Sequence, residues 1–358
     1  MSSRLRTRRR ITAAAVLASA AALLLPMSAS AHAEQSGPAP RAVADTAAPL
    51  PAVVQGEGRA IHPEGVTWDP TRNAFLIGSL RYGTISAVGA DGIPHTLVDD
   101  PRLIATGGIR VDAAHNRILA TYGDVYAGPN ALLSVGSTPQ TRGRYVGLAI
   151  INLSTGAVEK LVDLGQGPGL HLANDLALDA KGNAYVTDSF TGTIFKVTPS
   201  GTASTFLQDS ALDAGHDANG VPNVGVNGIV YDPAGFLIVV RYDNGSLFRI
   251  PVHRPKDFQE IRLDAPIPGA DGMALGADGT LYAATNTIKA NSTDALVKLR
   301  SEDGWRSART VSKVASPEAA PTTVALTPSG DYVLSANDNI LFNSGGSQTR
   351  DGFVLRRF

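Results

Sequence analysis

Six short segments of this chain repeat one pattern, in which a brief apolar stretch leads into a turn that contains Asp or Gly. The residues that open the six copies are, in chain order, Glu64, Gly107, Asn174, Asn227, Asp271 and Thr322. The Glu, Asn and Asp side chains among them offer oxygen ligands, which suit a hard cation with flexible coordination. Zinc favours His and Cys, and magnesium requires stricter octahedral geometry. The sequence therefore predicts a Ca²⁺ site, with another divalent cation as the alternative.

The spacing of the copies indicates which elements must hold these residues. The copies begin roughly 40 to 70 residues apart, and strand-rich repeats of about 40 to 50 residues are typical of β-propeller blades. The first strand of a blade lies against the central channel, so equivalent residues ring the axis at one height. Glu64, Asn174, Asn227 and Asp271 are therefore expected to converge. Any one Asn or Asp at a strand start is more often a turn residue, so the prediction depends on all four meeting.

Each repeat divides into four short strands separated by turn residues. In the third repeat these strands are expected at 176–178, 184–187, 193–197 and 203–207. The last repeat has candidate strands at 332–336 and 352–358 but lacks a fourth. Residues 52–55 are expected to supply that strand and close the ring.

Four aspartates recur in the turns between first and second strands, namely Asp69, Asp112, Asp179 and Asp232. We interpret them as turn residues that bond their own backbone, not as catalytic acids. The predicted fold class is all-β, a six-bladed β-propeller with four-stranded blades around a central metal-binding channel. It is expected to span residues 52–358.

The first 33 residues differ from the rest in composition. Five arginines between positions 4 and 10 precede an apolar run from Ile11 to Leu25, and small residues follow. This order is typical of a signal peptide, and the run is short for a transmembrane span. The arginines favour twin-arginine export, with the Sec route as the alternative. Residues 34–51 are rich in Ala and Pro and are interpreted as a flexible leader.

Overall composition excludes several classes of function. The net charge of −1 and pI of about 6.7 give no basic surface for nucleic acid. The absence of cysteine excludes disulfides, thiolate metal sites and a lipid anchor on cysteine. The motifs of serine hydrolases and of nucleotide-binding enzymes are also absent. We expect a secreted monomer with no nucleic-acid partner and no membrane anchor after processing.

The motifs around the axial residues resemble those of the SMP-30/gluconolactonase/LRE-like family. They are Pro63-Glu64-Gly65, Asn174-Asp175, Asn227-Gly228 and Asp271-Gly272-Met273. The resemblance covers roughly residues 54–358 and extends to the calcium-dependent diisopropylfluorophosphatase and bacterial lactonase propellers. It implies that Glu64, Asn174, Asn227 and Asp271 hold calcium and that Asp271 is the leading catalytic base or nucleophile. Because family members open sugar lactones, open other lactones or cleave phosphorus esters, the resemblance leaves the reaction open.

Further candidates follow from the antiparallel order of the strands. Each second strand ends beside the start of the first, on the face that carries the metal, where the two long insertions at 124–144 and 209–226 also fall. We expect substrate contacts from the residues near those ends, namely Arg81, Tyr82, Tyr122, His171, Leu172, Asp188, Arg241 and Asn286. Asp175 occupies a position where four other repeats have Gly, so it is the second catalytic candidate. The alternative for Asp175 is an Asx turn or a buried partner of a backbone amide.

The predicted function is a secreted, calcium-dependent hydrolase of ester bonds, a lactonase acting on a small-molecule lactone or ester. Sugar-lactone members of the family have Arg two residues before the first metal-binding Asn, and here Leu172 stands there. An apolar wall stabilises bound hydrocarbon, so we expect alkyl or aromatic lactones to be preferred over gluconolactone. The alternative is a non-catalytic, calcium-stabilised propeller that binds a ligand or protein on its loop face.

Overall fold

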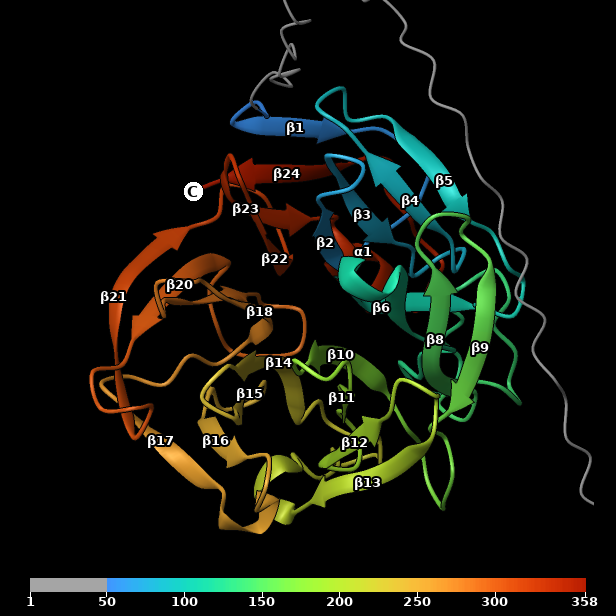
Figure 1. Cartoon of the computed structure of the whole chain (residues 1–358). Helices are drawn as coiled ribbons and strands as arrows, with labels where there is room; N and C mark the ends of the chain where they lie inside the picture. Colours follow the sequence, from blue (N-terminus) through green and yellow to red (C-terminus); the bar gives the residue numbers. More distant parts are fainter. Residues whose placement is uncertain (1–49) are drawn as a thin grey trace, which may run out of the picture. The chain divides into compact units, whose positions relative to one another are not determined.

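Short strands separated by Gly- and Asp-rich turns build the part of the chain that this computed structural model describes, residues 50–358. The strands form six groups of four around a central axis, as Figure 1 shows. Pairing within each group is antiparallel, and β17 and β21 join two neighbouring groups by a short parallel contact. The predicted all-β propeller with four-stranded blades is confirmed.

Every blade runs from its innermost strand at the axis to its outermost strand at the rim. Blade 1 contains β2 (Val66–Asp69), β3 (Ala74–Gly78), β4 (Ile85–Val88) and β5 (Pro94–Val98). Blade 2 contains β6 (Ala105–Asp112), β7 (Arg117–Gly123), β8 (Val146–Asn152) and β9 (Val158–Asp163). Blade 3 contains β10 (Ala173–Leu178), β11 (Ala184–Asp188), β12 (Thr193–Val197) and β13 (Ala203–Gln208).

The second half of the ring follows the same order. Blade 4 contains β14 (Val226–Asp232), β15 (Phe236–Arg241), β16 (Leu247–Pro251) and β17 (Gln259–Leu263). Blade 5 contains β18 (Ala270–Leu275), β19 (Leu281–Thr285), β20 (Ala295–Arg300) and β21 (Ser307–Ala315). Blade 6 contains β22 (Pro321–Thr327), β23 (Gly330–Ser335), β24 (Phe353–Arg357) and β1 (Val53–Gly56). Three 3₁₀ turns, η1 (Ala113–His115), η2 (Ser210–Leu212) and η3 (Pro255–Asp257), and one helix, α1 (Asp338–Asn343), complete the described elements.

The turns confirm the structural interpretation of three of the repeated aspartates. Oδ1 of Asp69, Asp179 and Asp232 each accepts a hydrogen bond from the backbone N–H two residues later. Asp112 differs, because its carboxylate pairs with the side chains of His115 and Arg117. Asp69, Asp179 and Asp232 therefore shape turns, as expected, and none of the four aspartates lines the cavity described below.

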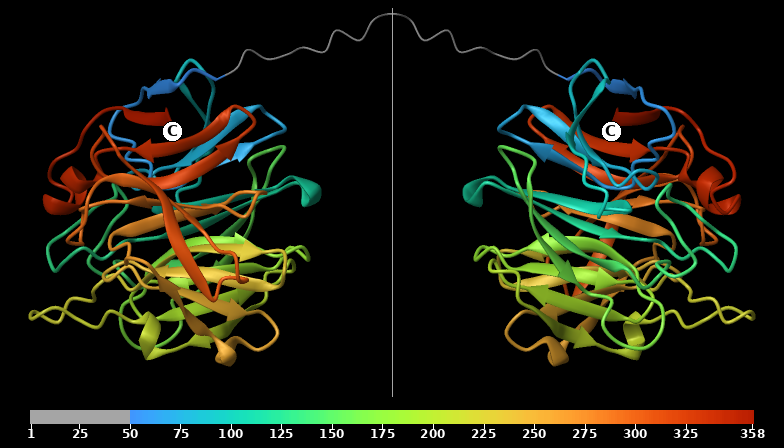
Figure 2. Two further views of the ribbon diagram at one scale, coloured as in Figure 1. Left: turned by 90° about the vertical axis from the view of Figure 1, so that its left-hand side faces the viewer. Right: turned by 90° about the vertical axis from the view of Figure 1, so that its right-hand side faces the viewer.

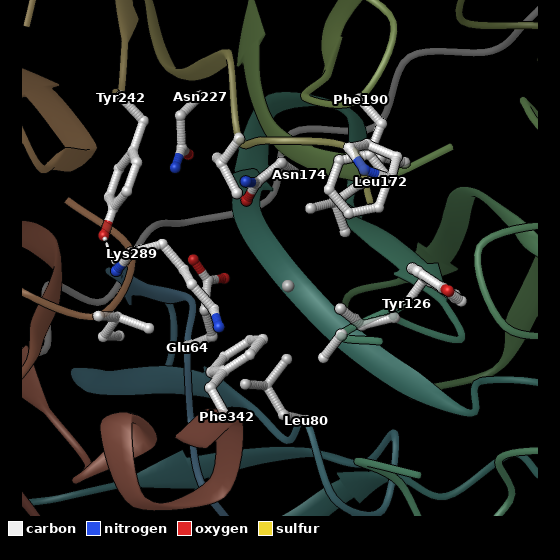
Figure 3. A pocket seen from close by; sticks show the side chains of 18 of the residues that line it. Glu64, Leu80, Tyr126, Leu172, Asn174, Phe190, Asn227, Tyr242, Lys289 and Phe342 are labelled. Carbon is white, nitrogen blue, oxygen red and sulfur yellow. Dashed lines mark hydrogen bonds between the residues drawn. The ribbon is translucent and has the colours of Figure 1, made fainter. Parts of the chain in front are cut away.

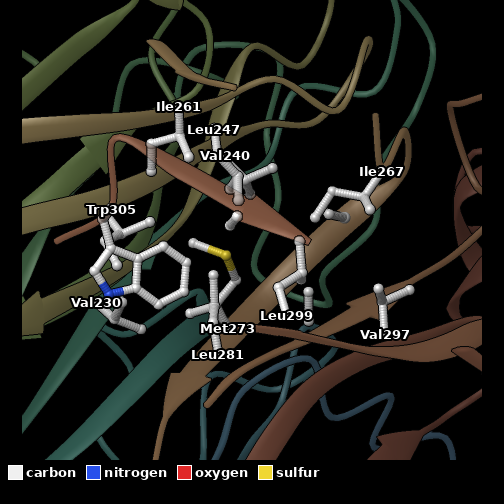
Figure 4. Packing of buried hydrophobic residues seen from close by; sticks show 14 of the residues in the cluster. Val230, Val240, Leu247, Ile261, Ile267, Met273, Leu281, Val297, Leu299 and Trp305 are labelled. Atoms are coloured by element: carbon white, nitrogen blue, oxygen red, sulfur yellow. The ribbon is translucent and has the colours of Figure 1, made fainter. Parts of the chain in front are cut away.

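Apolar side chains from facing sheets fill the space between neighbouring blades. Figure 4 shows the contact of blades 4 and 5, where Val240 and Leu247 pack with Met273, Leu281 and Trp305. The inner strands of each sheet are covered on both faces by the neighbouring blades and are mostly apolar, as in β11 and β15. The blades thereby form a rigid frame that fixes the axial ends of the innermost strands.

The ring closes through the N-terminal segment, as the sequence predicted. Strand β1 pairs antiparallel with β24, with Val54 opposite Leu355. Leu50 and Val54 are buried in the core of blade 6, and the Tyr332 hydroxyl donates to the Pro51 carbonyl at 2.7 Å. Leu50 and Pro51, which were predicted to belong to the leader, thus contact the propeller. The predicted signal peptide and the rest of the leader lie outside the described residues.

Removing the closing strand should destabilise the fold. A chain that begins at Glu57 exposes the edge of β24 and loses the burial of two aliphatic side chains, worth about 1.5–3 kcal/mol each. We expect its free energy of unfolding to fall by roughly 3–6 kcal/mol by the same estimate, relative to a control chain that begins at Ala47. Urea unfolding of both chains measures this difference. Equal stability would show that β1 does not hold the ring closed.

Three insertions depart from the regular blade. The connection β7–β8 covers residues 124–145, the connection β13–β14 covers 209–225, and α1 lies in the connection β23–β24. Figure 2 shows α1 and the long loops on one face of the ring, and all three insertions contribute to the wall of one cavity. Within residues 50–358, no helix is long and apolar enough to cross a membrane.

Candidate functional site

A cavity of about 250 Å³ lies on the axis of the ring (Figure 3). The residues that open the six repeats all line it, namely Glu64, Gly107, Asn174, Asn227, Asp271 and Thr322. Glu64, Asn174, Asn227 and Asp271 were predicted to converge at the axis, and all four line this cavity.

Irregular backbone directs these residues towards the axis. In five blades the innermost strand has a register shift at this level, between Thr106 and Ile109, Ala173 and Leu176, Val226 and Ile229, Ala270 and Met273, and Pro321 and Thr323. A bulge of this kind re-aims a side chain beside a functional site. A glycine directly after the axial residue lets neighbouring innermost strands approach closely. At Gly228, which follows Asn227, a Cβ would lie 2.1 Å from the Asp271 carbonyl oxygen.

Hydrogen bonds fix the orientation of the axial side chains. Asn227 Nδ2 donates to Asp271 Oδ1 at 2.9 Å, and Asn286 Nδ2 donates to Asp271 Oδ2 at 2.7 Å. Asn174 Nδ2 donates to Ser189 Oγ at 3.0 Å. In both axial asparagines the amide nitrogen is thus bound to protein, which leaves the amide oxygen for a ligand.

Two side-chain oxygens of the axial residues, Glu64 Oε2 and Asn227 Oδ1, are buried without any hydrogen-bond partner among the described residues. A buried polar atom without a partner carries the full cost of its desolvation, so such atoms usually mark a missing ligand, ion or water. Thr322 Oγ1 meanwhile donates to the Glu64 backbone carbonyl at 2.7 Å and holds that segment in place.

The carboxyl groups repel one another in this setting. Burial, followed by the charges of Asp271, Asp175 and Asp338, raises the pKa of Glu64 well above its usual value. Burial likewise raises the pKa of Asp271 to about 7, although the hydrogen bonds from Asn286 and Asn227 oppose the shift. A cation between Glu64 and Asp271 would relieve this repulsion.

The residues present therefore fit a hard divalent cation. Unpartnered oxygens, two buried carboxylates and two amides oriented by their nitrogens form an oxygen donor set of the kind calcium takes. Within residues 50–358 no cluster of three or more His, Cys, Asp or Glu side chains could hold a metal ion. The expected set contains only two such residues, since Asn supplies the others.

Asp175, the second catalytic candidate, is not among the residues that line the cavity. Its carboxylate pairs with Arg110, with Arg110 Nη2 at 3.1 Å from Oδ1, and accepts the Leu176 backbone N–H at 2.8 Å. Four other blades have Gly at the position of Asp175, where a Cβ would meet neighbouring backbone. In blade 3 the Asp175 side chain is directed to Arg110. The structure favours the alternative interpretation of Asp175 as a buried structural partner.

Three of the eight predicted substrate contacts belong to the site. Tyr122 and Leu172 line the cavity. Asn286 is fully buried, donates to Asp271 and accepts from the Tyr242 hydroxyl at 2.6 Å, so it orients Asp271. The prediction that Leu172 forms part of an apolar wall is supported by its packing with Leu80 and Phe342.

The other five do not line the cavity. Arg81 Nη1 donates to the Leu133 carbonyl at 2.8 Å and anchors the β7–β8 loop. Arg241 binds Asp243 through Nε and Nη2. Tyr82 is 42% exposed on the surface. Each of these side chains is directed to a loop or to solvent.

His171 and Asp188 bind each other behind the cavity wall. The His171 Nδ1 and Asp188 Oδ2 atoms are 2.7 Å apart, and Asp188 Oδ1 accepts the Leu172 N–H at 2.9 Å. The hydrogen bond between the two side chains raises the pKa of His171. Their role is to hold the segment with Leu172 that leads into β10.

Sequence reasoning missed several residues of the wall. Phe190, Tyr242, Lys289, Asp338 and Phe342 all line the cavity, the last two from α1. Figure 3 shows an apolar side with Leu80, Tyr126, Leu172, Phe190 and Phe342, and a polar side with Glu64, Asn227, Tyr242 and Lys289. One signal was available for α1, since residues 336–352 form an insertion comparable to the other two.

No family model and no curated protein sequence matches the chain. Solved structures do match. The allergen Mala s 1 of Malassezia sympodialis has 20% identity and a TM-score of 0.65, over 86% of this chain and 96% of that one. A gluconolactonase from Xanthomonas campestris has 15% identity and a TM-score of 0.56, over 85% and 88% of the two chains. The calcium-binding regucalcin of Agrobacterium tumefaciens has 17% identity and a TM-score of 0.56, over 86% and 94%. The resemblance inferred from the motifs is thereby confirmed at the level of the fold.

Proposed function

We propose that this protein is a secreted, calcium-dependent hydrolase that opens lactone rings. The observation that carries the proposal is the meeting of Glu64, Asn174, Asn227 and Asp271 in one axial cavity, with buried oxygens of Glu64 and Asn227 that lack partners among the described residues. The similarity to structures named gluconolactonase and calcium-binding regucalcin supports the choice of reaction and ion.

Each residue has a defined task in this proposal. Glu64, Asn174, Asn227 and Asp271 would hold the cation, which when bound supplies Lewis-acid stabilisation of negative charge on an ester carbonyl oxygen. Asn286 orients Asp271 through its amide nitrogen. The Tyr242 hydroxyl in turn accepts the Lys289 backbone N–H at 3.0 Å, which links the β19–β20 loop to the site.

The wall of the cavity suggests the class of lactone. Leu80, Leu172, Phe190 and Phe342 face the axial residues from one side, where a sugar lactone would need hydroxyl partners. Burying hydrocarbon stabilises a complex by about 0.8 kcal/mol per methylene, which corresponds to about fourfold in binding. A hydroxylated ring gains nothing from such a wall.

We expect kcat/KM for δ-decalactone and for the aromatic lactone dihydrocoumarin to exceed kcat/KM for gluconolactone by about tenfold or more, since several methylenes are buried. In the Leu172→Arg variant this ratio should fall, because the substitution puts a charge into the apolar wall. Leu132→Arg is the matched control, as Leu132 is 42% exposed and does not line the cavity. A clear preference of the unaltered protein for gluconolactone would show that the argument from Leu172 is wrong.

The function itself is tested with a panel of lactones and linear esters, measured with calcium and again with a chelator. Hydrolysis that requires calcium supports the proposal. The alternative is a non-catalytic binding protein that uses calcium only to join its blades. A calcium-dependent rise in melting temperature without hydrolysis of any ester in the panel would favour that alternative.

A further inference from the structure

One carboxylate in the cavity wall has no task in the function proposed above. Asp338 is the first residue of α1 and lines the cavity, yet its side chain is fully buried. Its Oδ2 atom has no hydrogen-bond partner among the described residues. A buried carboxylate oxygen left in this state indicates that a ligand or a reacting group completes its bonding.

His62 fixes which oxygen of Asp338 is available. The His62 Nε2 atom accepts the Arg350 backbone N–H at 3.0 Å, so the ring carries its proton on Nδ1. Nδ1 lies 3.1 Å from Asp338 Oδ1 and donates to it. His62 is itself buried and held in the left-handed region, with φ of 47°. Oδ1 is therefore occupied, and Oδ2 is the oxygen left for chemistry.

Two other buried carboxylates, Asp271 and Asp175, already have partners for their oxygens. Both oxygens of Asp271 accept amide N–H bonds, and Asp175 pairs with Arg110 away from the cavity. Asp338 lines the same cavity as Glu64 and Asp271. Asp338 is not one of the four residues that open the repeats and are expected to hold the cation, so its free oxygen has no assigned partner.

Apolar side chains share the cavity wall with Asp338. Phe342 lies four residues after Asp338, so both project from one side of α1, and both line the cavity. Phe342 and Leu172 both pack against the apolar cluster that contains Leu80, so this part of the wall offers few polar partners to a water molecule. A water molecule held there would have the carboxylate as its acceptor.

We propose that Asp338 is the general base of the lactonase reaction and that His62 is its positioning residue. The assignment rests on the proposed function. Asp338 Oδ2 takes one proton from a water molecule, whose oxygen forms a bond to the lactone carbonyl carbon. The ring C–O bond then breaks, and the protonated Asp338 returns its proton to the alkoxide that leaves. The product is a hydroxy acid, which gives its acidic proton to solvent, so atoms and charge balance.

The test compares Asp338→Asn with the unaltered protein on δ-decalactone and dihydrocoumarin. The variant keeps an oxygen to accept from His62 but cannot take a proton. We expect kcat to fall by about 10²–10⁴, the range typical of a general base, while the calcium dissociation constant changes less than about threefold. Asp351→Asn is the matched control, because Asp351 is an exposed residue of the same β23–β24 connection that caps the Ala60 N–H.

A second variant separates a chemical role from a structural one. Asp338→Ala should be inactive, and added formate should restore part of kcat by supplying the missing carboxylate. Rescue supports the proposal, since formate cannot repair a misfolded wall. An Asp338→Asn variant that keeps kcat within about threefold would overturn it. Loss of calcium binding in that variant would also overturn it, because Asp338 would then be a metal ligand. Failure of the unaltered protein to hydrolyse either lactone would refute the proposed function and this assignment together.

Discussion

Replacing Asp271 with Asn should abolish calcium binding and lower kcat/KM for lactones by about 10²–10³ or more, the size of effect seen when one group that stabilises developing charge is removed. The variant loses one of two axial carboxylates. It also creates a conflict, because Oδ1 and Oδ2 of Asp271 accept N–H bonds from Asn227 and Asn286. Either orientation of the new amide sets one NH₂ group against another. Rotation of the Asn227 amide would resolve the conflict only by withdrawing its oxygen from the cavity.

Calorimetric titration with calcium and steady-state kinetics on the lactone panel measure both effects. Asp175→Asn is the informative comparison, since Asp175 is buried like Asp271 but pairs with Arg110 outside the cavity wall. We expect that variant to unfold at a lower temperature and still to bind calcium. The assignment of the metal site would be wrong if Asp271→Asn bound calcium as tightly as the unaltered protein.

The cation-free protein should lose stability as the pH rises from 5 to 8. The pKa of Asp271 is raised by burial to about 7, and that of Glu64 is raised in the same direction. A carboxyl group with a higher pKa in the folded state stabilises the fold while it is protonated. This contribution is complete below the unfolded pKa of about 4 and is lost as the pH passes through about 7. A pKa difference of this size between the folded and unfolded states changes the free energy of unfolding by a few kcal/mol, or the melting temperature by roughly 5–10 °C.

Calcium should reverse this trend, because it binds the ionised carboxylates. The gain in melting temperature on adding calcium is therefore expected to be larger at pH 8 than at pH 5. Thermal unfolding at several pH values, with calcium and with chelator, measures this. In Asp271→Asn the pH dependence of the cation-free protein should be weaker. A melting temperature at pH 8 that is indifferent to chelator would count against a cation at the axis.

The sequence repeats predicted the blades correctly because the patterns that indicate a strand or a turn span only a few neighbouring residues. Strand β12 was predicted at the bounds it has, and the closing segment was predicted within one residue of β1. Turn residues such as Asp179 and alternating apolar positions act over a few residues, so the sequence alone reports them. The axial set followed from the same repeat, since equivalent positions on innermost strands must meet at the axis.

Only the tertiary structure decided which polar side chains reach the cavity. Asp175 and Asp271 both lie near the start of an innermost strand. Asp175 pairs with Arg110 of the neighbouring blade, whereas Asn227 and Asn286 hold Asp271 in the cavity wall. Arg110 lies 65 residues from Asp175 in the chain, so no local pattern records the pairing. Asp338 and His62 are 276 residues apart and meet only because the ring closes and α1 folds over the axis. Local patterns fix strands and turns, whereas a site between blades depends on which partners the closed ring brings within hydrogen-bond distance.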